Sequence, residues 1–449
     1  NSLWIELGDR QRVVTHGASI LRSPVVLGVR TSIAQSLGWT GRDDVTVQDI
    51  AAAARTGAFR LAMTSATQSN SGATAYLGFL YALAGNPDIL TLEDLARPDL
   101  QAAARDLLAQ VDRSSGSSGW LMDALLANPD AYDAMVNYES VILETNAALT
   151  RAGREPLYLV YPANGLAVAD SPLAFVSKGD PAKEEQFLAL QAHLLSPEVQ
   201  AQLLREGRRT GLLGLAGGNA GPLWNRDWGV DPDRAIAPVP MPAAEVIREA
   251  LRLYQSDLRK PSLTVWVLDV SGSMEGQPLA DLKRAMDLLL DPEAAALSLL
   301  QPSARDLTVI LPFSNRVFPA ITVEGNDPAA LAEARAGVDG LAADGGTDLY
   351  AALAAAMDLL APYAADGRLA AYLPAIVAMT DGASDQSNRD AMFRHLEELG
   401  FAREVPIHAI AFGAADTDQL QELNAATIGR LFPAGDDLAA TLRSAKGYN

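Results

Sequence analysis

Residues 263–273 read LTVWVLDVSGS. The first six of them form a continuous, largely apolar run, which is typical of a strand buried on both faces of a parallel sheet. Directly after this run, Asp269, Ser271 and Ser273 bring one carboxylate and two hydroxyls, with Gly272 between the serines. Ligands of open parallel sheets bind beyond the carboxyl ends of the strands. The stretch therefore predicts a buried strand and marks the sheet edge at which a site is expected.

The same pattern recurs along the second half of the chain. Apolar runs at 307–311, 375–379 and 407–412 predict further buried strands, and the segments between them have the composition and spacing of helices. Such strand–helix alternation predicts a doubly wound, open parallel sheet. The expected helices cover about 278–290, 327–340, 348–361, 387–399 and 416–425.

A change in sequence pattern near residue 260 suggests where this unit begins. Residues 231–242 are proline-rich, as in an extended connector, and an amphipathic helix is expected at about 243–257. Proline at position 261 then precedes the first buried run. We therefore predict two domains, residues 1–258 and residues 259–449.

Two more polar segments lie at ends of the predicted elements. Thr347, in Gly345-Gly346-Thr347, leads into a helix, and Asp381, in Thr380-Asp381-Gly382, follows a strand. A single segment of this kind often only forms a turn or caps a helix, the role that we expect for Asp348. Three segments at one sheet edge favour a cation site made of hard oxygen ligands, suited to Mg²⁺, Mn²⁺ or Ca²⁺ rather than Zn²⁺. The predicted ligands are Asp269, Ser271, Ser273, Thr347 and Asp381.

These three segments resemble the metal-ion-dependent adhesion site of von Willebrand factor A-type domains, and all five ligand positions match. The resemblance covers the predicted second domain, residues 259–449. It implies that two of the five groups bind the cation through water. It further implies that an acidic side chain of a protein partner fills the remaining coordination position of Mg²⁺ (or Mn²⁺ or Ca²⁺).

The first half of the chain holds two polar segments that precede helices. Residues 67–72 (TQSNSG) come before an apolar helix expected at about 73–84, and residues 114–119 (SSGSSG) come before Trp120. Hydroxyls and free amides at a helix N-terminus form an anion-holding arrangement. Each segment alone is also explained by helix capping or by a flexible serine–glycine loop.

Residues 69–72 with their helix resemble bacterial extracellular solute-binding proteins of the two-lobed periplasmic class, over about residues 1–245. Five further segments carry the same resemblance, residues 23–26, 137–140, 161–165, 173–176 and 195–200. The resemblance implies a two-lobed α/β domain that takes a small oxyanion or polar solute. The implied ligand contacts are Ser69, Asn70, Ser71, Ser118 and Tyr138. Elements that open the first lobe in that family are missing before residues 3–5. We therefore expect a longer natural protein with a signal or anchor segment upstream. The alternative is a degenerate first lobe that serves only as a scaffold.

Composition excludes several classes of function. The 449 residues carry a net charge of −20, which disfavours nucleic acid as a partner, and they include no cysteine. No run approaches the roughly 20 apolar residues of a membrane-spanning helix. The four histidines are scattered without a nucleophile signature, and no phosphate-binding loop motif is present. We expect a protein that is not an enzyme.

Three functional interpretations follow from the two resemblances. The first is an exported bacterial cell-surface binding or adhesion protein that captures an acidic group of a protein partner through its cation, in the extracellular space or cell envelope. The second is a solute receptor of a transport system, in which the first domain binds a small oxyanion or polar solute and the A-type domain contacts proteins. The third, an intracellular domain that works with a separate motor, is disfavoured by the likeness of the first half to secreted proteins.

Overall fold

The computed structural model describes residues 9, 12–213, 221–381, 384–412, 417–435 and 437–447. Residues 3–5 and Gly382, which contribute to the resemblances above, lie outside the described residues. The chain divides into two compact units, residues 1–111 with 117–251 and residues 112–116 with 252–449. Each unit is built around a six-stranded sheet with helices, which confirms the predicted α/β class. The domain boundary after residue 258 stays a prediction.

The sheet of the second unit has the strand order β12-β11-β10-β7-β8-β9. All neighbouring strands are parallel except β8 and β9, which are antiparallel. Every residue of β7 is buried, as its apolar sequence predicts. The two edge strands β9 and β12 were not predicted. The strands are β7 (Ser262–Asp269), β8 (Leu307–Phe313), β9 (Ile321–Glu324), β10 (Leu373–Thr380), β11 (Ile407–Ala411) and β12 (Leu431–Pro433).

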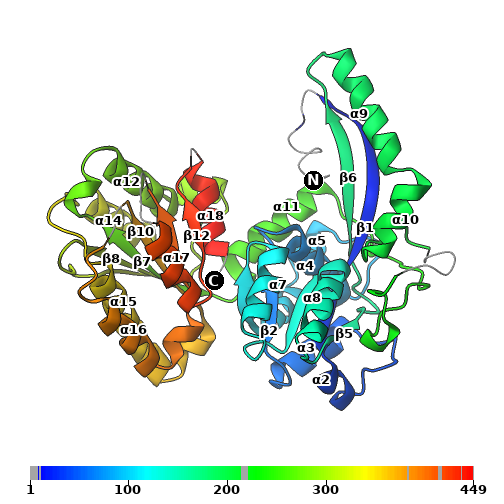
Figure 1. The fold of residues 1–449 in the computed structure, drawn as a ribbon, viewed down its shortest axis with the longest axis horizontal. Coiled ribbons are helices and arrows are strands. Elements are labelled where there is room, and N and C mark those ends of the chain that lie inside the picture. The colour runs from blue at the N-terminus through cyan, green and yellow to red at the C-terminus, as the bar shows by residue number, and fades with distance from the viewer. Residues whose placement is uncertain are drawn as a thin grey trace. The chain divides into compact units, whose positions relative to one another are not determined.

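Helices cover both faces of this sheet. Apolar side chains of α15, α16 and α17 pack with alternate residues of the strands, such as Val265 and Val267, in one buried core. Figure 1 shows α12 and α14, which contact each other, on the opposite side of the strands. The helices are α12 (Gln277–Leu290), α13 (Pro292–Leu297), α14 (Pro328–Asp339), α15 (Leu349–Ala365), α16 (Arg389–Glu398), α17 (Thr417–Ala426) and α18 (Leu438–Gly447).

A buried carboxylate fixes the start of this sheet. Asp306, which directly precedes β8, is 3% exposed and accepts hydrogen bonds from the backbone N–H of Ser262 at 2.8 Å and of Ser303 at 2.9 Å. The guanidinium of Arg259 pairs with the same carboxylate, at 3.1 Å from Nη1 to Oδ1. Burial raises the pKa of Asp306, but Arg259, Lys446 and the hydrogen bonds outweigh it and hold the pKa at about 2. Asp306 thereby joins the first residue of β7 to the start of β8.

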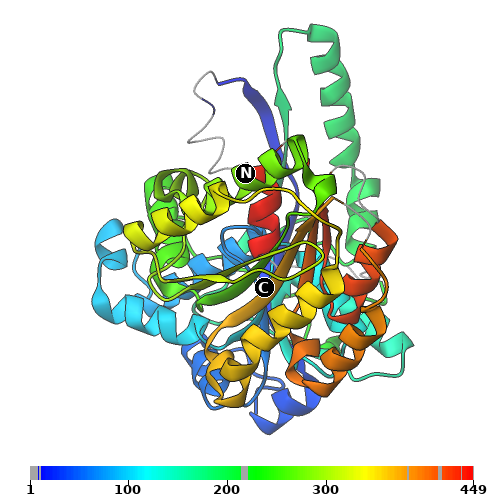
Figure 2. The ribbon, with the colours of Figure 1, turned by 90° about the vertical axis from the view of Figure 1, so that its left-hand side faces the viewer.

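The first unit is organised by one long strand. The second half of β1 (Val14–Arg30) pairs antiparallel with β4 (Ala134–Tyr138) and β5 (Leu157–Val160), within the sheet order β3-β2-β4-β1-β5. Its first half pairs with β6 (Val168–Val176), and α9 (Pro181–Leu194) packs against this two-stranded ribbon. Figure 2 shows the ribbon and α9 extending away from the rest of this unit. The remaining strands of this sheet are β2 (Leu61–Thr64) and β3 (Val111–Ser115), and residues 112–115 of β3 are counted with the second unit in the division above.

A glycine lets the helix α4 (Asn70–Leu83) lie close to β2. A Cβ at Gly72 would lie 2.3 Å from the carbonyl oxygen of Thr64, so any larger residue would push the helix away from the strand end. None of the described helices is both long and apolar enough to cross a membrane. The other helices of this unit are α2 (Thr31–Ser36), α3 (Val47–Arg55), α5 (Leu92–Leu95), α6 (Pro98–Leu108), α7 (Ser118–Ala127), α8 (Glu139–Arg151), α10 (Pro197–Arg205) and α11 (Ala244–Leu253).

An ion pair lies in the interior of this unit. The guanidinium of Arg209 donates to Glu139, at 2.7 Å from Nε to Oε2 and 2.9 Å from Nη2 to Oε1, and both side chains are almost completely buried. Arg209 also stacks on Trp224, and Tyr161 donates to the Glu139 carboxylate. Glu139 is thus the buried partner of an arginine.

The pKa of Asp306 predicts how stability depends on pH. Because this pKa is lowered from 3.8 to about 2 in the folded chain, its contribution is complete above pH 3.8 and is lost as the pH falls through 2. Asp306→Asn should lower the free energy of unfolding by about 3 kcal/mol at neutral pH, since it leaves Arg259 buried without its carboxylate. Chemical unfolding at several pH values should also show a weaker loss of stability between pH 4 and pH 2 in this variant.

The matched control is Asp366→Asn, which removes an exposed carboxylate that pairs with Arg368. A surface ion pair of this kind contributes little to stability. If both variants lost the same stability, the role given to Asp306 would be wrong.

Candidate metal centre and hydroxyl cluster

The first predicted ligand, Asp269, is the last residue of β7 and is completely buried. Its Oδ1 accepts the backbone N–H of Ser271 at 2.8 Å, and its Oδ2 accepts the hydroxyl of Thr380 at 2.5 Å. The parallel pairing of β7 with β10 places Leu268 beside Met379, which brings the two strand ends together. Sheet register therefore determines where this carboxylate lies.

Hydrogen bonds connect four of the five predicted ligands. The hydroxyls of Ser271 and Ser273 lie 3.1 Å apart, and Ser273 donates to Oδ1 of Asp381 at 2.8 Å. Asp269 joins this chain through the backbone of Ser271. The loops after β7 and β10 thus bring two carboxylates and two hydroxyls to one place.

Thr347, the fifth predicted ligand, lies on the loop before α15. This loop contacts both the loop after β7 and the loop after β10. Gly272 donates its backbone N–H to the carbonyl of Gly345 at 2.9 Å, which joins this loop to the loop after β7. The carbonyl of Thr347 accepts the N–H of Asp385 at 2.9 Å, which joins this loop to the loop after β10. Within the described residues, the hydrogen bonds of Thr347 are made by its carbonyl oxygen, so its hydroxyl is not joined to the chain of four.

The charges of Asp269 and Asp381 and their surroundings suit a divalent cation. Burial raises the pKa of Asp269 despite the hydrogen bonds to its carboxylate, and the nearby charge of Asp381 acts in the same direction. Among the described residues, no lysine or arginine forms an ion pair with Asp269 or Asp381. Nor do the described residues contain a group of three or more His, Cys, Asp or Glu side chains suited to a metal. A cation here would depend on serine and threonine oxygens beside the two carboxylates, as hard ions accept. That the five residues hold one stays a prediction.

Two neighbours of the predicted ligands have structural roles. Asp348 caps α15, since its Oδ1 accepts the N–H of Ala351 at 3.0 Å, as expected, and its Oδ2 accepts Asn388 at 2.6 Å. Thr380, whose hydroxyl binds Asp269, was not singled out as a functional residue. Its position next to Asp381 at a strand end was the signal that could have identified it.

The predicted serines of the first unit also meet. The hydroxyl of Ser71 lies 2.7 Å from that of Ser118 and 3.0 Å from that of Ser69, at the start of α4 and α7. It also lies 2.7 Å from the hydroxyl of Thr64, the last residue of β2, which was not predicted as a site residue. We call these four residues, Thr64, Ser69, Ser71 and Ser118, the hydroxyl cluster.

Asn70 and Tyr138 form a pair beside this cluster. The side-chain amide of Asn70 donates to the hydroxyl of Tyr138 at 3.0 Å, and burial raises the pKa of that phenol. Hydroxyls and amides at two helix starts are able to bind an anion. In the hydroxyl cluster, however, the oxygens already bond to one another, so capping and packing account for the same contacts.

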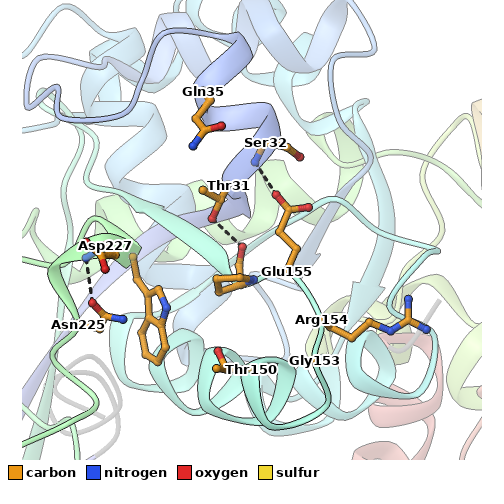
Figure 3. A pocket seen from close by; sticks show the side chains of 11 residues that line it. Thr31, Ser32, Gln35, Thr150, Gly153, Arg154, Glu155, Asn225 and Asp227 are labelled. Atoms are coloured by element: carbon orange, nitrogen blue, oxygen red, sulfur yellow. Dashed lines mark hydrogen bonds between the residues drawn. The ribbon is translucent and has the colours of Figure 1, made fainter.

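An open pocket of about 580 Å³ lies elsewhere in the first unit (Figure 3). Its walls come from α2, the end of α8 and the segment around Trp228. Two of its polar groups are bonded within the wall, since Thr31 donates to the carbonyl of Pro156 at 2.9 Å and Ser32 donates its N–H to Glu155 at 2.5 Å. None of the predicted site residues lines it.

Comparison with protein families agrees with both resemblances. Residues 1–209 match the family model described as bacterial extracellular solute-binding protein. Residues 265–441 match the family model described as von Willebrand factor type A domain. No curated protein matches the chain.

Solved structures similar to the chain include three proteins of different origin. One is described as von Willebrand factor type A from Catenulispora acidiphila, with 17% identity over 42% of this chain and 43% of that chain (TM-score 0.34). Another is the pilus adhesin SpaC from Lactobacillus rhamnosus GG, with 13% identity over 42% and 30% (TM-score 0.32). The third is proximal thread matrix protein 1 from the mussel byssus with a zinc-occupied metal-ion-dependent adhesion site, with 15% identity over 46% and 52% (TM-score 0.30). The chain spans about half or less of the length of each of these three proteins.

Metal addition should reveal the predicted centre. Mn²⁺ or Mg²⁺ should stabilise the protein in thermal melts, by about 2.7 kcal/mol at 100 times the dissociation constant, and calorimetric titration should give one site. Asp269→Asn should fold in chelator but give no response to the ion, because it removes one of two carboxylates without changing side-chain volume.

The control for charge is Asp344→Asn, at an exposed residue of the loop before α15 whose backbone N–H donates to the carbonyl of Val270. This variant should keep the response to metal. Metal binding that survives Asp269→Asn undiminished would refute the site.

Proposed function

We propose that this protein is an exported bacterial cell-surface binding or adhesion protein whose second unit captures an acidic group of a protein partner through a divalent cation. The observation that carries the proposal is the meeting of Asp269, Ser271, Ser273 and Asp381 at the carboxyl edge of the sheet. The matches to the two family models support a binding protein that works outside the cell.

The chemistry of the site explains why a third carboxylate would be attracted. Asp269 and Asp381 would balance the charge of a Mg²⁺, Mn²⁺ or Ca²⁺ ion, while the neutral hydroxyls of the serines and Thr347 would donate little electron density to it. Such an ion binds an additional anionic oxygen when one coordination position is open. The bound cation would supply the attraction, and this chain would supply the fixed ligands around it.

We also propose that the second unit binds without catalysing a reaction. Its two histidines have other roles: His408 is buried and accepts the backbone N–H of Arg430 at 3.0 Å, and His395 lies 2.8 Å from Asp358. Neither contact joins a predicted metal ligand, and both are typical of structural histidines. The functional groups gathered at the site are oxygen ligands rather than a nucleophile and a base.

The hydroxyl cluster supports a second candidate function. In this alternative the first unit is the solute receptor of a transport system, and the A-type unit contacts proteins. Ser69 and Ser118 are partly exposed at the starts of α4 and α7, where backbone N–H groups favour an anion. Asn70 and Tyr138 lie beside them with further polar groups. The ligand would be a small oxyanion or another polar solute.

Binding to immobilised peptides would test the leading proposal. Short peptides that carry one Glu or Asp should retain the protein in Mn²⁺, and the same peptides with Gln or Asn should not. Chelator and Asp269→Asn should each abolish retention, because both remove the cation bridge, whereas Asp344→Asn should leave it in place. Equal retention by the amide peptides would rule out capture through an acidic group.

Calorimetry with inorganic phosphate and sulfate would test the alternative. Ser71→Ala should weaken binding about tenfold, the effect of losing about one hydrogen bond to a charged group. Ser36→Ala, which removes an exposed hydroxyl that donates to the carbonyl of Ile33, is the control and should bind normally. If neither anion binds the unmodified protein, the hydroxyl cluster is not an oxyanion site.

A further inference from the structure

One buried amide contacts both the segment that follows Asp381 and the helix that follows Thr347. Gln419, on α17, is 7% exposed. Its Oε1 accepts the backbone N–H of Ser384 at 2.9 Å, and its Nε2 donates to the hydroxyl of Tyr350 at 3.1 Å. Ser384 lies three residues after Asp381, and Tyr350 lies three residues after Thr347. A single side chain thus joins the segment after Asp381 to helix α15, which begins two residues after Thr347.

Ser384 joins the same two loops directly. Its hydroxyl accepts the backbone N–H of Leu349 at 2.8 Å and lies 3.3 Å from the carbonyl oxygen of Thr347. The N–H of Asp385 donates to that same carbonyl at 2.9 Å. The start of α15 and the loop after β10 are therefore fastened together just beside the predicted ligands.

The network is buried, which makes it stiff. Tyr350 is completely buried, and Ser384 is 7% exposed. Removing one partner of a buried hydrogen bond leaves the other unsatisfied, which destabilises the fold. Movement of either loop away from the other would break several of these bonds at once. The spacing between the two loops is consequently hard to change.

We propose that Gln419 is a positioning residue that sets the size of the cation site and so favours Mg²⁺ over Ca²⁺. The proposal rests on the metal centre described above. Mg²⁺ requires nearly octahedral ligands at 2.0–2.1 Å, whereas Ca²⁺ accepts 2.3–2.6 Å and irregular geometry. Loops clamped by Gln419 resist the expansion that Ca²⁺ needs. Gln419 acts through the backbone of Ser384 and the hydroxyl of Tyr350 rather than by touching the ion.

Separate titrations of the intact protein with Mg²⁺ and with Ca²⁺ test this role. Gln419→Leu should weaken Mg²⁺ binding about tenfold or more, within the range for residues that orient metal ligands. Ca²⁺ binding should change much less, so the ratio of the two affinities should fall. The matched control is Gln421→Leu, the same substitution at an exposed residue of the same helix, which should leave both affinities unchanged. A loss of folded protein would lower both apparent affinities equally and leave their ratio as it was.

Tyr350→Phe provides a second test that does not depend on the folding of the first variant. It removes only the hydroxyl that Gln419 contacts, and it should lower the Mg²⁺ to Ca²⁺ affinity ratio in the same direction by a smaller factor. An unchanged ratio in both variants would overturn the clamp while leaving the metal centre intact. If the unmodified protein bound neither ion, the metal centre itself would be refuted, and the clamp with it.

Discussion

Asp269 places a carboxylate at the end of a strand whose eight residues are all buried, and the site of the second unit depends on how that charge is accommodated. Taking a carboxylate out of water costs several kcal/mol unless other groups compensate. Hydrogen bonds from Ser271 and Thr380 compensate in part, yet the pKa of Asp269 remains raised. A divalent cation would supply the missing positive charge. The buried position of Asp269 thus links the folding of the central strand to a preference for metal.

The parts of this unit that could be predicted are those fixed by local pattern. Fully buried strands leave continuous apolar runs, so β7, β8, β10 and β11 were expected close to their observed bounds. Strand β9 has exposed and half-exposed residues around a single buried Val323, and β12 has only three residues. Neither edge strand leaves a continuous apolar run in the sequence, because edge strands are short and partly exposed to solvent. The loops that carry the predicted ligands could be located because each one directly follows a buried strand or precedes a helix in the sequence.

Contacts between distant segments could not be predicted in the same way. Gln419 contacts Ser384 and Tyr350 across 35 and 69 residues of sequence, and nothing in the sequence around it marks it as different from Gln421. Thr64 likewise joins the hydroxyl cluster only because Gly72 lets α4 approach the end of β2. Such partners are determined by packing in three dimensions, whereas Ser71 and Ser118 were visible from their positions before helices.

The two units present opposite electrostatic environments to a ligand. The hydroxyl cluster has neutral oxygens at two helix starts, where exposed backbone N–H groups favour an anion directly. The second unit gathers Asp269 and Asp381, and its loops also carry the exposed Asp344 and Asp385, on a chain whose net charge is −20. An acidic partner would be repelled by these carboxylates until a cation neutralises Asp269 and Asp381 and offers its open coordination position. Capture of an acidic group by this unit would therefore be conditional on metal, and the surrounding carboxylates would make that dependence steeper.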